Sequence, residues 1–249
     1  MSTTRARKGI ILAGGSGTRL HPATLAVSKQ LLPVYDKPLI YYPIQMLVDA
    51  GITDIMLVTG GNYAGDFLRL IGNGEDFGLS RINYAYQKGN GGIAEALGLT
   101  REFVGDDKLV VVLGDNILEN GIATGVEAFS QQQEGSRIFL KAVDHPWEYG
   151  IAEVDGSRVK GIVEKPQNPT SDLAVIGVYM FPPEVFDIVN GLTPSARGEL
   201  EITDVNNAYI ERGQMEFEMV DGWWLDAGEN YEALLQANIT VARQAGIEI

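Results

Sequence analysis

The sequence predicts an α/β protein with three layers, in which helices cover both faces of a central sheet. Short apolar runs rich in β-branched residues alternate with stretches of helical periodicity, which is typical of strands joined by helices. Two of these runs contain almost no polar residue, as expected for strands covered on both faces. In the second half of the chain the runs crowd together with turns between them. We therefore expect a mixed, mainly parallel sheet with an antiparallel part.

The first predicted strand spans residues 8–13 and breaks into Gly14-Gly15-Ser16-Gly17. Three glycines in four residues permit positive φ and remove every Cβ, so that backbone N–H groups can approach a bulky ligand. Such a loop suits phosphate oxygens. Arg19 adds a planar cation to the loop and Lys29 offers a second cation nearby.

Alternative interpretations of this loop remain open. Glycine-rich turns between strands and helices also occur for packing alone. Two well-known phosphate motifs do not match, because a Walker loop requires a Gly-Lys-Ser/Thr sequence and a dinucleotide fingerprint requires a glycine where this chain has Leu20. The ATPase and dehydrogenase interpretations are therefore disfavoured.

The remaining elements follow from the same patterns, taken in chain order. Further strands are predicted from apolar runs at residues 55–59, 82–86, 109–113 and 138–143. The crowded part of the chain predicts strands at residues 151–154, 159–163 and 174–181. Helices are predicted at residues 43–50, 92–103, 201–212 and 229–243.

Composition limits the class of protein. The chain has 249 residues, of which 45% are hydrophobic, and it shows no linker and no repeat, so we expect a single domain over residues 1–249. It has no cysteine, which excludes disulfides, thiolate nucleophiles and thiolate–zinc sites. Its two histidines are too few for a His-rich metal site. The basic N-terminus precedes an apolar stretch too short for a signal peptide, and no run could span a bilayer. We therefore expect a cytoplasmic protein without a membrane partner.

The net charge of −14 argues against nonspecific nucleic-acid binding, so no nucleic-acid partner is expected. An acidic protein binds phosphates only where local cations and a bound divalent metal reverse the field. The few Lys and Arg residues beside glycine turns are therefore informative.

Two aspartates are candidate metal ligands. Asp115 follows the strand predicted at residues 109–113, at the edge where open α/β sheets bind ligands. Asp226 likewise ends an apolar run before a glycine turn. Mg²⁺ binds through one or two carboxylates together with substrate phosphates, and this pair fits that description. Alternatively, Asp115 merely caps the following turn.

Two further segments carry charge at the ends of predicted elements. Glu164 and Lys165 close the strand before Pro166, and the alternation of strand side chains predicts that they lie on opposite faces. The segment of residues 195–204 contains Arg197, and its composition indicates an N-capped helix start with acidic residues in the first turn.

The longer pattern of residues 12–20, followed by residues 29–34 and by Lys37-Pro38, closely resembles the signature of the sugar-1-phosphate nucleotidyltransferases. Within that family the chain is most similar to a short form that uses thymidine nucleotides, and the resemblance runs from Gly9 to about Asn238. It implies the Rossmann-like fold of nucleotide-diphospho-sugar transferases. It also implies a Mg²⁺-dependent transfer from dTTP to glucose 1-phosphate that gives dTDP-glucose and pyrophosphate, as in deoxysugar biosynthesis, by a homo-oligomer.

The resemblance also implies roles for single residues. The nucleotide would be bound by Leu12, Gly14, Gly15, Gly17 and Thr18, with Gln87 reading the pyrimidine and Gly92 leaving room for its ring. The sugar phosphate would be bound by Tyr149, Gly150, Glu164, Lys165, Val175 and Arg197. Catalysis would rest on Arg19, Lys29 and Lys165, and Mg²⁺ on Asp115 and Asp226.

Two rival functions remain. The same chemistry could use another base or sugar, as in a uridylyltransferase. The chain could also be a catalytically silent nucleotide-sugar-binding subunit. Retention of the implied charged residues counts against silence, namely Arg19, Lys29, Asp115, Lys165 and Asp226.

Overall fold

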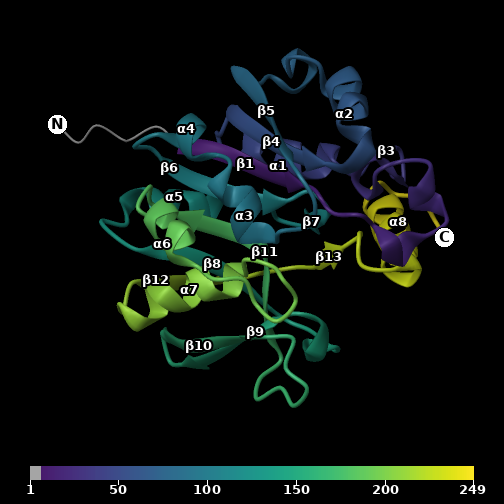
Figure 1. Ribbon diagram of the computed structural model, residues 1–249. Helices are drawn as coiled ribbons and strands as arrows, with labels where there is room; N and C mark the ends of the chain where they lie inside the picture. Colours follow the sequence, from purple (N-terminus) through teal and green to yellow (C-terminus); the bar gives the residue numbers. More distant parts are fainter. Residues whose placement is uncertain (1–6) are drawn as a thin grey trace.

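The computed structural model describes residues 7–249 and is built around strand β1 (Arg7–Ala13), which lies inside a mixed sheet (Figure 1). The basic N-terminal residues 1–6 lie outside the described part. Parallel partners flank β1 on both sides, β4 (Asp54–Gly60) on one and β6 (Lys108–Leu113) on the other. Strand β5 (Arg81–Gln87) pairs parallel to β4 and ends this half of the sheet.

The other half of the sheet is largely antiparallel, as the crowded runs predict. Strand β11 (Leu173–Phe181) pairs antiparallel with β6, with β8 (Ser136–Ala142) and with β9 (Gly150–Asp155). Outside these, β10 (Arg158–Glu164) pairs with β9, and β12 (Met215–Met219) runs parallel to β8. The predicted mixed sheet is therefore confirmed.

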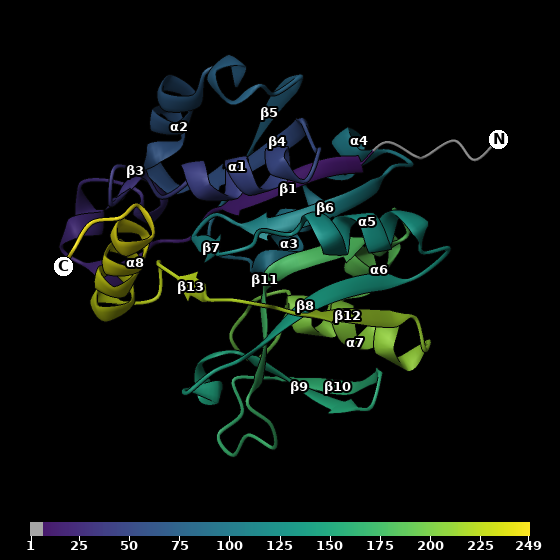
Figure 2. The ribbon, with the colours of Figure 1, turned by 180° about the vertical axis from the view of Figure 1, so that it is seen from behind.

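Helices cover both faces of the sheet and complete the three layers. Figure 1 looks onto the face covered by α3 (Ile93–Gly98), α6 (Val185–Gly191) and α7 (Ile202–Glu211), with α4 (Arg101–Val104) nearby. Figure 2 looks onto the opposite face, which α1 (Tyr41–Asp49), α5 (Ala123–Gln131) and α2 (Ala64–Ile71) cover.

The core divides along the alternation of β1. Ile10 and Leu12 belong to one hydrophobic cluster and Ile11 and Ala13 to the other, because successive strand side chains point to opposite faces. A third, smaller cluster lies under α8 (Tyr231–Gln244) and contains Val34 and Ala237. The hairpin of β2 (Pro33–Val34) and β3 (Lys37–Pro38) contributes residues to this cluster, and so does the antiparallel pair of β7 (Asn116–Leu118) and β13 (Trp224–Asp226).

One helix prediction differs from the structure, and three helices were not predicted. The helix predicted over residues 92–103 is two helices, α3 and α4, and the break falls where the hydroxyl of Thr100 donates to the carbonyl of Leu97 at 2.8 Å instead of facing solvent. The sequence analysis does not predict helices α2, α5 and α6. Among residues 7–249, no helix is both long enough and apolar enough to span a bilayer.

Candidate active site

All of the site residues predicted from the sequence line a single cavity of about 420 Å³. The cavity opens at the carboxyl ends of β1, β5 and β6, and its other wall comes from β9, β10 and the segment before α7. Ligands of open α/β sheets bind at this edge. Segments that are far apart in the sequence therefore share one concave surface.

The glycine loop after β1 forms the first wall. Gly15 and Gly17 have φ values of 100° and 61°, in the left-handed region that favours glycine. The hydroxyl of Thr24 donates to the carbonyl of Gly17 at 2.7 Å and holds the loop. Arg19 is exposed, and within the described chain it has no carboxylate partner. The loop thus presents backbone groups and an unpaired cation to the cavity.

Lys29 and Asp115 form an ion pair at the floor of the cavity, with the lysine Nζ 2.5 Å from the aspartate Oδ2. The two side chains are only 17% and 9% exposed. Burial favours the neutral form of Asp115, but the adjacent Lys29 ammonium outweighs it and lowers the pKa of this carboxyl. Burial likewise opposes the charge on Lys29, yet Asp115 and Asp226 together raise its pKa.

Asp226 ends strand β13, which pairs antiparallel with β7, and it lies opposite Asn116 in this pair. The loop after it comes close because residue 228 is glycine: a Cβ on Gly228 would lie 2.4 Å from Asp115 Oδ2. Burial and the negative charge of Asp115 raise the pKa of Asp226 to about 7. The two carboxylates thus repel each other electrostatically, and the Lys29 ammonium attracts both.

This donor set fits a hard divalent cation that shares its coordination with a ligand. Residues 7–249 contain no group of three or more His, Cys, Asp or Glu side chains able to hold a metal. Asp115 and Asp226 would supply two carboxylates to such an ion and leave its remaining positions to phosphate oxygens or water, which is how Mg²⁺ is commonly bound.

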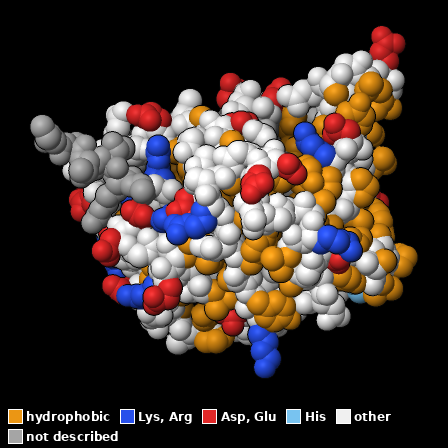
Figure 3. Space-filling model, turned by 90° about the horizontal axis from the view of Figure 1, so that it is seen from above, with side chains coloured by type: hydrophobic (Ala, Val, Ile, Leu, Met, Phe, Trp, Pro, Cys, Tyr) orange, Lys and Arg blue, Asp and Glu red, His pale blue; other side chains and the backbone are white. Residues whose placement is uncertain are grey.

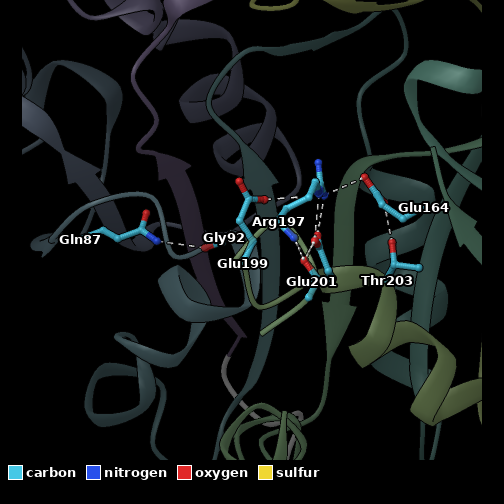
Figure 4. A network of polar contacts seen from close by, with 8 residues as sticks. Gln87, Gly92, Glu164, Arg197, Glu199, Glu201 and Thr203 are labelled. Carbon is cyan, nitrogen blue, oxygen red and sulfur yellow. Dashed lines mark hydrogen bonds and ion pairs between the residues drawn. The ribbon is translucent and has the colours of Figure 1, made fainter. Parts of the chain in front are cut away.

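Gln87 ends β5 and is 6% exposed. Its Nε2 donates to the carbonyl of Gly92 at 3.0 Å (Figure 4). The same nitrogen also donates to Glu95 Oε2 at 2.7 Å. Gly92 has a φ of 96°, and a Cβ there would lie 2.5 Å from the carbonyl oxygen of Leu200. The close approach of Leu200 thus gives Gly92 a packing reason to be glycine.

Glu164 and Lys165 both line the cavity, so the prediction that they lie on opposite faces is wrong. Strand β10 ends at Glu164, and Lys165 has a φ of 44°, which takes it out of the strand alternation. Its N–H donates to the carbonyl of Tyr149 at 3.0 Å. Lys165 is exposed, and no described carboxylate pairs with it.

Tyr149 and Gly150 lie at the start of β9, beside the turn that holds Lys165. The Tyr149 hydroxyl donates to Glu229 Oε2 at 2.6 Å, and its ring packs edge-on against Trp224 with centroids 5.3 Å apart. Burial and the neighbouring carboxylates raise the pKa of Tyr149, so it remains a neutral donor. Val175 of β11 is buried in the same wall.

Arg197 contacts three glutamates from two segments (Figure 4). Its Nη2 lies 2.7 Å from Glu201, 3.3 Å from Glu164 and 3.7 Å from Glu199. Hydrogen bonding to Glu201 raises the pKa of Arg197. The Thr203 hydroxyl donates to the other oxygen of Glu164 at 2.7 Å. This network ties the segment before α7 to the end of β10.

The helix start predicted within residues 195–204 is confirmed, with Asp204 in its first turn, but the predicted side-chain N-cap is wrong. Helix α7 begins at Ile202 after Glu201, which makes no side-chain capping bond. The Ser195 hydroxyl donates to Glu201 Oε1 at 2.6 Å rather than accepting from helix N–H groups. The segment is therefore a loop held by side chains, and this loop places Arg197 at the cavity.

The sequence interpretation missed several polar residues of the cavity, including Gln30, Asn116 and Glu229. Asn116 accepts from the N–H of Gly177 at 3.2 Å and from Trp224 Nε1 at 2.6 Å, and it donates to Asp115 Oδ1 at 3.2 Å. Asn116 directly follows Asp115 and Gln30 directly follows Lys29, so their positions next to predicted site residues could have indicated that they line the cavity. Glu229 begins the helix predicted at residues 229–243, and helical periodicity does not indicate that it lines the cavity.

Comparison with known proteins agrees with this geometry. The family model described as "Nucleotidyl transferase" matches residues 8–244. The chain is 46% identical to a glucose-1-phosphate thymidylyltransferase of Neisseria meningitidis, over 92% of this chain and 81% of that protein. It is also 46% identical to a glucose-1-phosphate thymidylyltransferase of Mycolicibacterium smegmatis, over 93% and 81%.

Solved structures share the fold. A Bacillus anthracis protein described as a glucose-1-phosphate thymidylyltransferase, crystallised with sucrose, superposes with a TM-score of 0.91 at 45% identity and covers 98% of this chain and 97% of that chain. A UDP-glucose pyrophosphorylase solved with UDP-glucose shows the fold at 24% identity, with a TM-score of 0.83 over 96% and 99% of the two chains. The chain is thus similar to thymidylyltransferases over most of its own length and most of theirs. The family match and these similarities show that the chain belongs to the nucleotidyl transferase family.

Proposed function

We propose that this protein transfers a thymidylyl group from dTTP to glucose 1-phosphate and releases pyrophosphate. The observation that carries the proposal is the distribution of cations in the cavity. Arg19 follows β1 and Lys165 follows β10, on either side of β6 in the sheet, and both lack a carboxylate partner in the described chain. Asp115 and Asp226 line the same cavity and carry the opposite charge. Such a cavity suits two phosphate groups that must meet.

The chemistry needs little proton transfer, because the sugar phosphate is already an anion. Its oxygen attacks the α-phosphorus of the nucleotide in line, the bond from this phosphorus to the β-phosphate oxygen breaks, and pyrophosphate leaves. Catalysis is then positioning together with charge neutralisation. We assign the pyrophosphate to Arg19, Lys29 and the glycine loop, and the attacking phosphate to Lys165.

Mg²⁺ is part of this proposal. Asp115 and Asp226 would hold the ion, which supplies positive charge to the nucleotide phosphates when bound. The ion pair of Lys29 with Asp115 keeps that aspartate ionised, and therefore ready as a ligand, at neutral pH.

On the sugar side, Glu164 and the backbone at Gly150 would face the hydroxyl groups. A Cβ on Gly150 would lie 3.2 Å from Glu164 Oε2, so glycine leaves the space beside this carboxylate free. Tyr149 and Val175 would pack against the ring, and Arg197 would share its charge between the glutamates and the phosphate.

One experiment tests the proposal. Pyrophosphate release is measured with Mg²⁺ over a grid of nucleoside triphosphates and sugar 1-phosphates. We expect dTTP with glucose 1-phosphate to give the highest kcat/KM, and UTP to be used about tenfold to two-hundredfold less well, because a methyl group in a pocket gives only about 1–3 kcal/mol. UTP used best would support the uridylyltransferase alternative, and absence of turnover with every pair would support the silent binding subunit.

We further propose a homo-oligomer that works in the cytoplasm, where nucleotide triphosphates are present. Hydrophobic side chains gather on the side of the molecule away from the N-terminus (Figure 3). Leu25, Tyr231 and Leu235 are 66%, 42% and 61% exposed, and Tyr231 reaches the carbonyl of Leu20 in the segment that carries Leu25. Such a group suits a subunit contact. Light scattering of the purified protein is expected to give a multiple of the 27.0 kDa chain mass, and a monomer at all concentrations would contradict this.

A further inference from the structure

Gln87 is fixed in one orientation by its neighbours. An amide has one end that only donates and one end that only accepts. Both partners of Gln87 Nε2 are pure acceptors, the carbonyl of Gly92 and the carboxylate of Glu95. An amide turned the other way would place its oxygen against two oxygens. The chemistry of the partners, rather than the placement of the atoms alone, therefore settles which end is the nitrogen.

The oxygen of Gln87 lies beside the glycine loop of the cavity. The ideal Cβ position of Gly14 lies 2.8 Å from Gln87 Oε1, so this oxygen lies over the start of the glycine loop, which lines the cavity. No described residue donates a hydrogen bond to it. With Gln87 only 6% exposed and its two N–H groups used, the residue offers the cavity one acceptor.

Glu95 is held in place by local backbone geometry. It is the third residue of α3, where a negative charge is favourable and where a glutamate side chain can fold back towards the residues before the helix. The side chain lies over Gly91, where a Cβ would come within 2.1 Å of Glu95 Oε2. Glycine at position 91 thus leaves the space through which Glu95 reaches Gln87.

We infer that Glu95 is a positioning residue that sets base specificity, by holding Gln87 so that only a base with a ring N–H at position 3 can bind. This inference rests on the proposed function. Thymine and uracil carry that N–H and can donate to Gln87 Oε1. Cytosine carries a lone pair at the same ring position, which faces the oxygen without a hydrogen bond. A site built to pair with a donor rejects an analogue that lacks it by about 10⁴-fold.

The test compares dTTP, dUTP, UTP and dCTP with glucose 1-phosphate, by kcat/KM for pyrophosphate release. The wild-type protein is expected to prefer dTTP over dCTP by about 10³-fold or more. In Glu95→Gln the new amide can donate to Gln87 Oε1 as well as accept from its Nε2, so that only the Gly92 carbonyl still opposes the turned amide. We expect the preference for dTTP over dCTP to fall by about tenfold or more.

Two further variants separate specificity from folding. Gly91→Ala keeps every charge but displaces the flexible end of Glu95, so the same loss of discrimination is expected. Glu102→Gln removes an exposed charge in α4 and is expected to leave the ratio unchanged. The ratio of two substrates on one preparation does not depend on how much of the protein is folded, so a structural defect alone leaves it unchanged.

The outcomes distinguish the inference from the proposed function. A wild-type protein that prefers UTP over dTTP but rejects dCTP would overturn the thymidylyl assignment and support the role of Glu95. Wild-type turnover with dCTP close to that with dTTP would overturn the inference and leave nucleotidyl transfer intact. Glu95→Gln and Gly91→Ala variants that both discriminate as well as Glu102→Gln would also overturn it.

Discussion

The two walls of the cavity each carry one unpaired cation and one paired cation, but the pairs differ in burial. On the side of the parallel strands, Arg19 is unpaired within the described chain and Lys29 is paired with Asp115 at 17% and 9% exposure. On the antiparallel side, Lys165 is unpaired there and Arg197, whose side chain is 43% exposed, shares its charge among three glutamates.

This difference follows from where each pair lies in the sheet. The pair of Lys29 with Asp115 is placed by β6 at the middle of the sheet, where water is scarce and an electrostatic contact is strong. The Arg197 network joins a loop to the edge strand β10, where solvent screens each contact. We therefore expect the buried pair to keep its geometry without a ligand, and the exposed contacts of Arg197 to rearrange more readily.

The largest expected effect is on turnover at the paired aspartates. Asp115→Asn and Asp226→Asn are each expected to lower kcat by about a hundredfold or more, because each removes an anionic ligand and leaves phosphate charge unscreened. Steady-state pyrophosphate release with saturating Mg²⁺ measures this. Asp106→Asn, a change at an exposed aspartate outside the cavity, is the matched control. Near-normal turnover in either cavity variant would remove that residue from the metal site.

The same two substitutions are expected to differ in stability. Asp115→Asn leaves the Lys29 ammonium buried without its ion-pair partner, and we expect the free energy of unfolding to fall by about 2 kcal/mol. This is less than the ~3–5 kcal/mol that is usual for a broken buried pair, because the charge of Asp226 still stabilises the ammonium. Asp226→Asn removes a carboxylate that Asp115 repels, so no fall is expected. Urea unfolding without divalent metal measures both. Equal losses would show that the two aspartates are equivalent before metal binds.

The unpaired cations are expected to separate the two substrates. Arg19→Ala is expected to raise KM for the nucleotide, whereas Lys165→Ala is expected to lower kcat/KM for the sugar phosphate. Each change should be about tenfold to a hundredfold, because a hydrogen bond to a charged group contributes about 1.5–3 kcal/mol. Neither should alter the unfolding midpoint, since neither has a described carboxylate partner. Steady-state kinetics with each substrate varied in turn checks this, and the same selective loss in both variants would show that the walls are wrongly assigned.

The smallest expected effect is on the exposed network. Arg197→Ala is expected to lower the free energy of unfolding by less than about 1 kcal/mol, because at 43% side-chain exposure solvent screens the three contacts. The loss should shrink further at high salt. Urea unfolding at two salt concentrations measures it. A loss as large as that of Asp115→Asn would mean that the two pairs do not differ in the way their burial indicates.

Much of the fold could be predicted because most of its strands are short apolar runs that are visible in the sequence. The apolar runs at residues 109–113 and 174–181 correspond to β6 and β11, and strand periodicity alone locates them. Helices α2, α5 and α6 were missed, since short helices draw most of their stability from the surface they cover rather than from their own sequence. The break at Thr100 likewise depends on a hydroxyl that bonds back to the chain.

The sequence by itself determined which groups could meet phosphates: the glycine loop after β1, its arginine, and aspartates at the ends of strands. These are local properties, since backbone freedom and side-chain charge belong to single residues and their neighbours. Only the tertiary structure decided how those groups are used. Lys29 is paired because β6 brings Asp115 to it, Lys165 faces the cavity because its left-handed backbone leaves the strand, and Gln87 presents an oxygen because Glu95 and Gly92 accept from its nitrogen. Each is a contact whose strength depends on distance and burial, and those quantities exist only once the chain has folded.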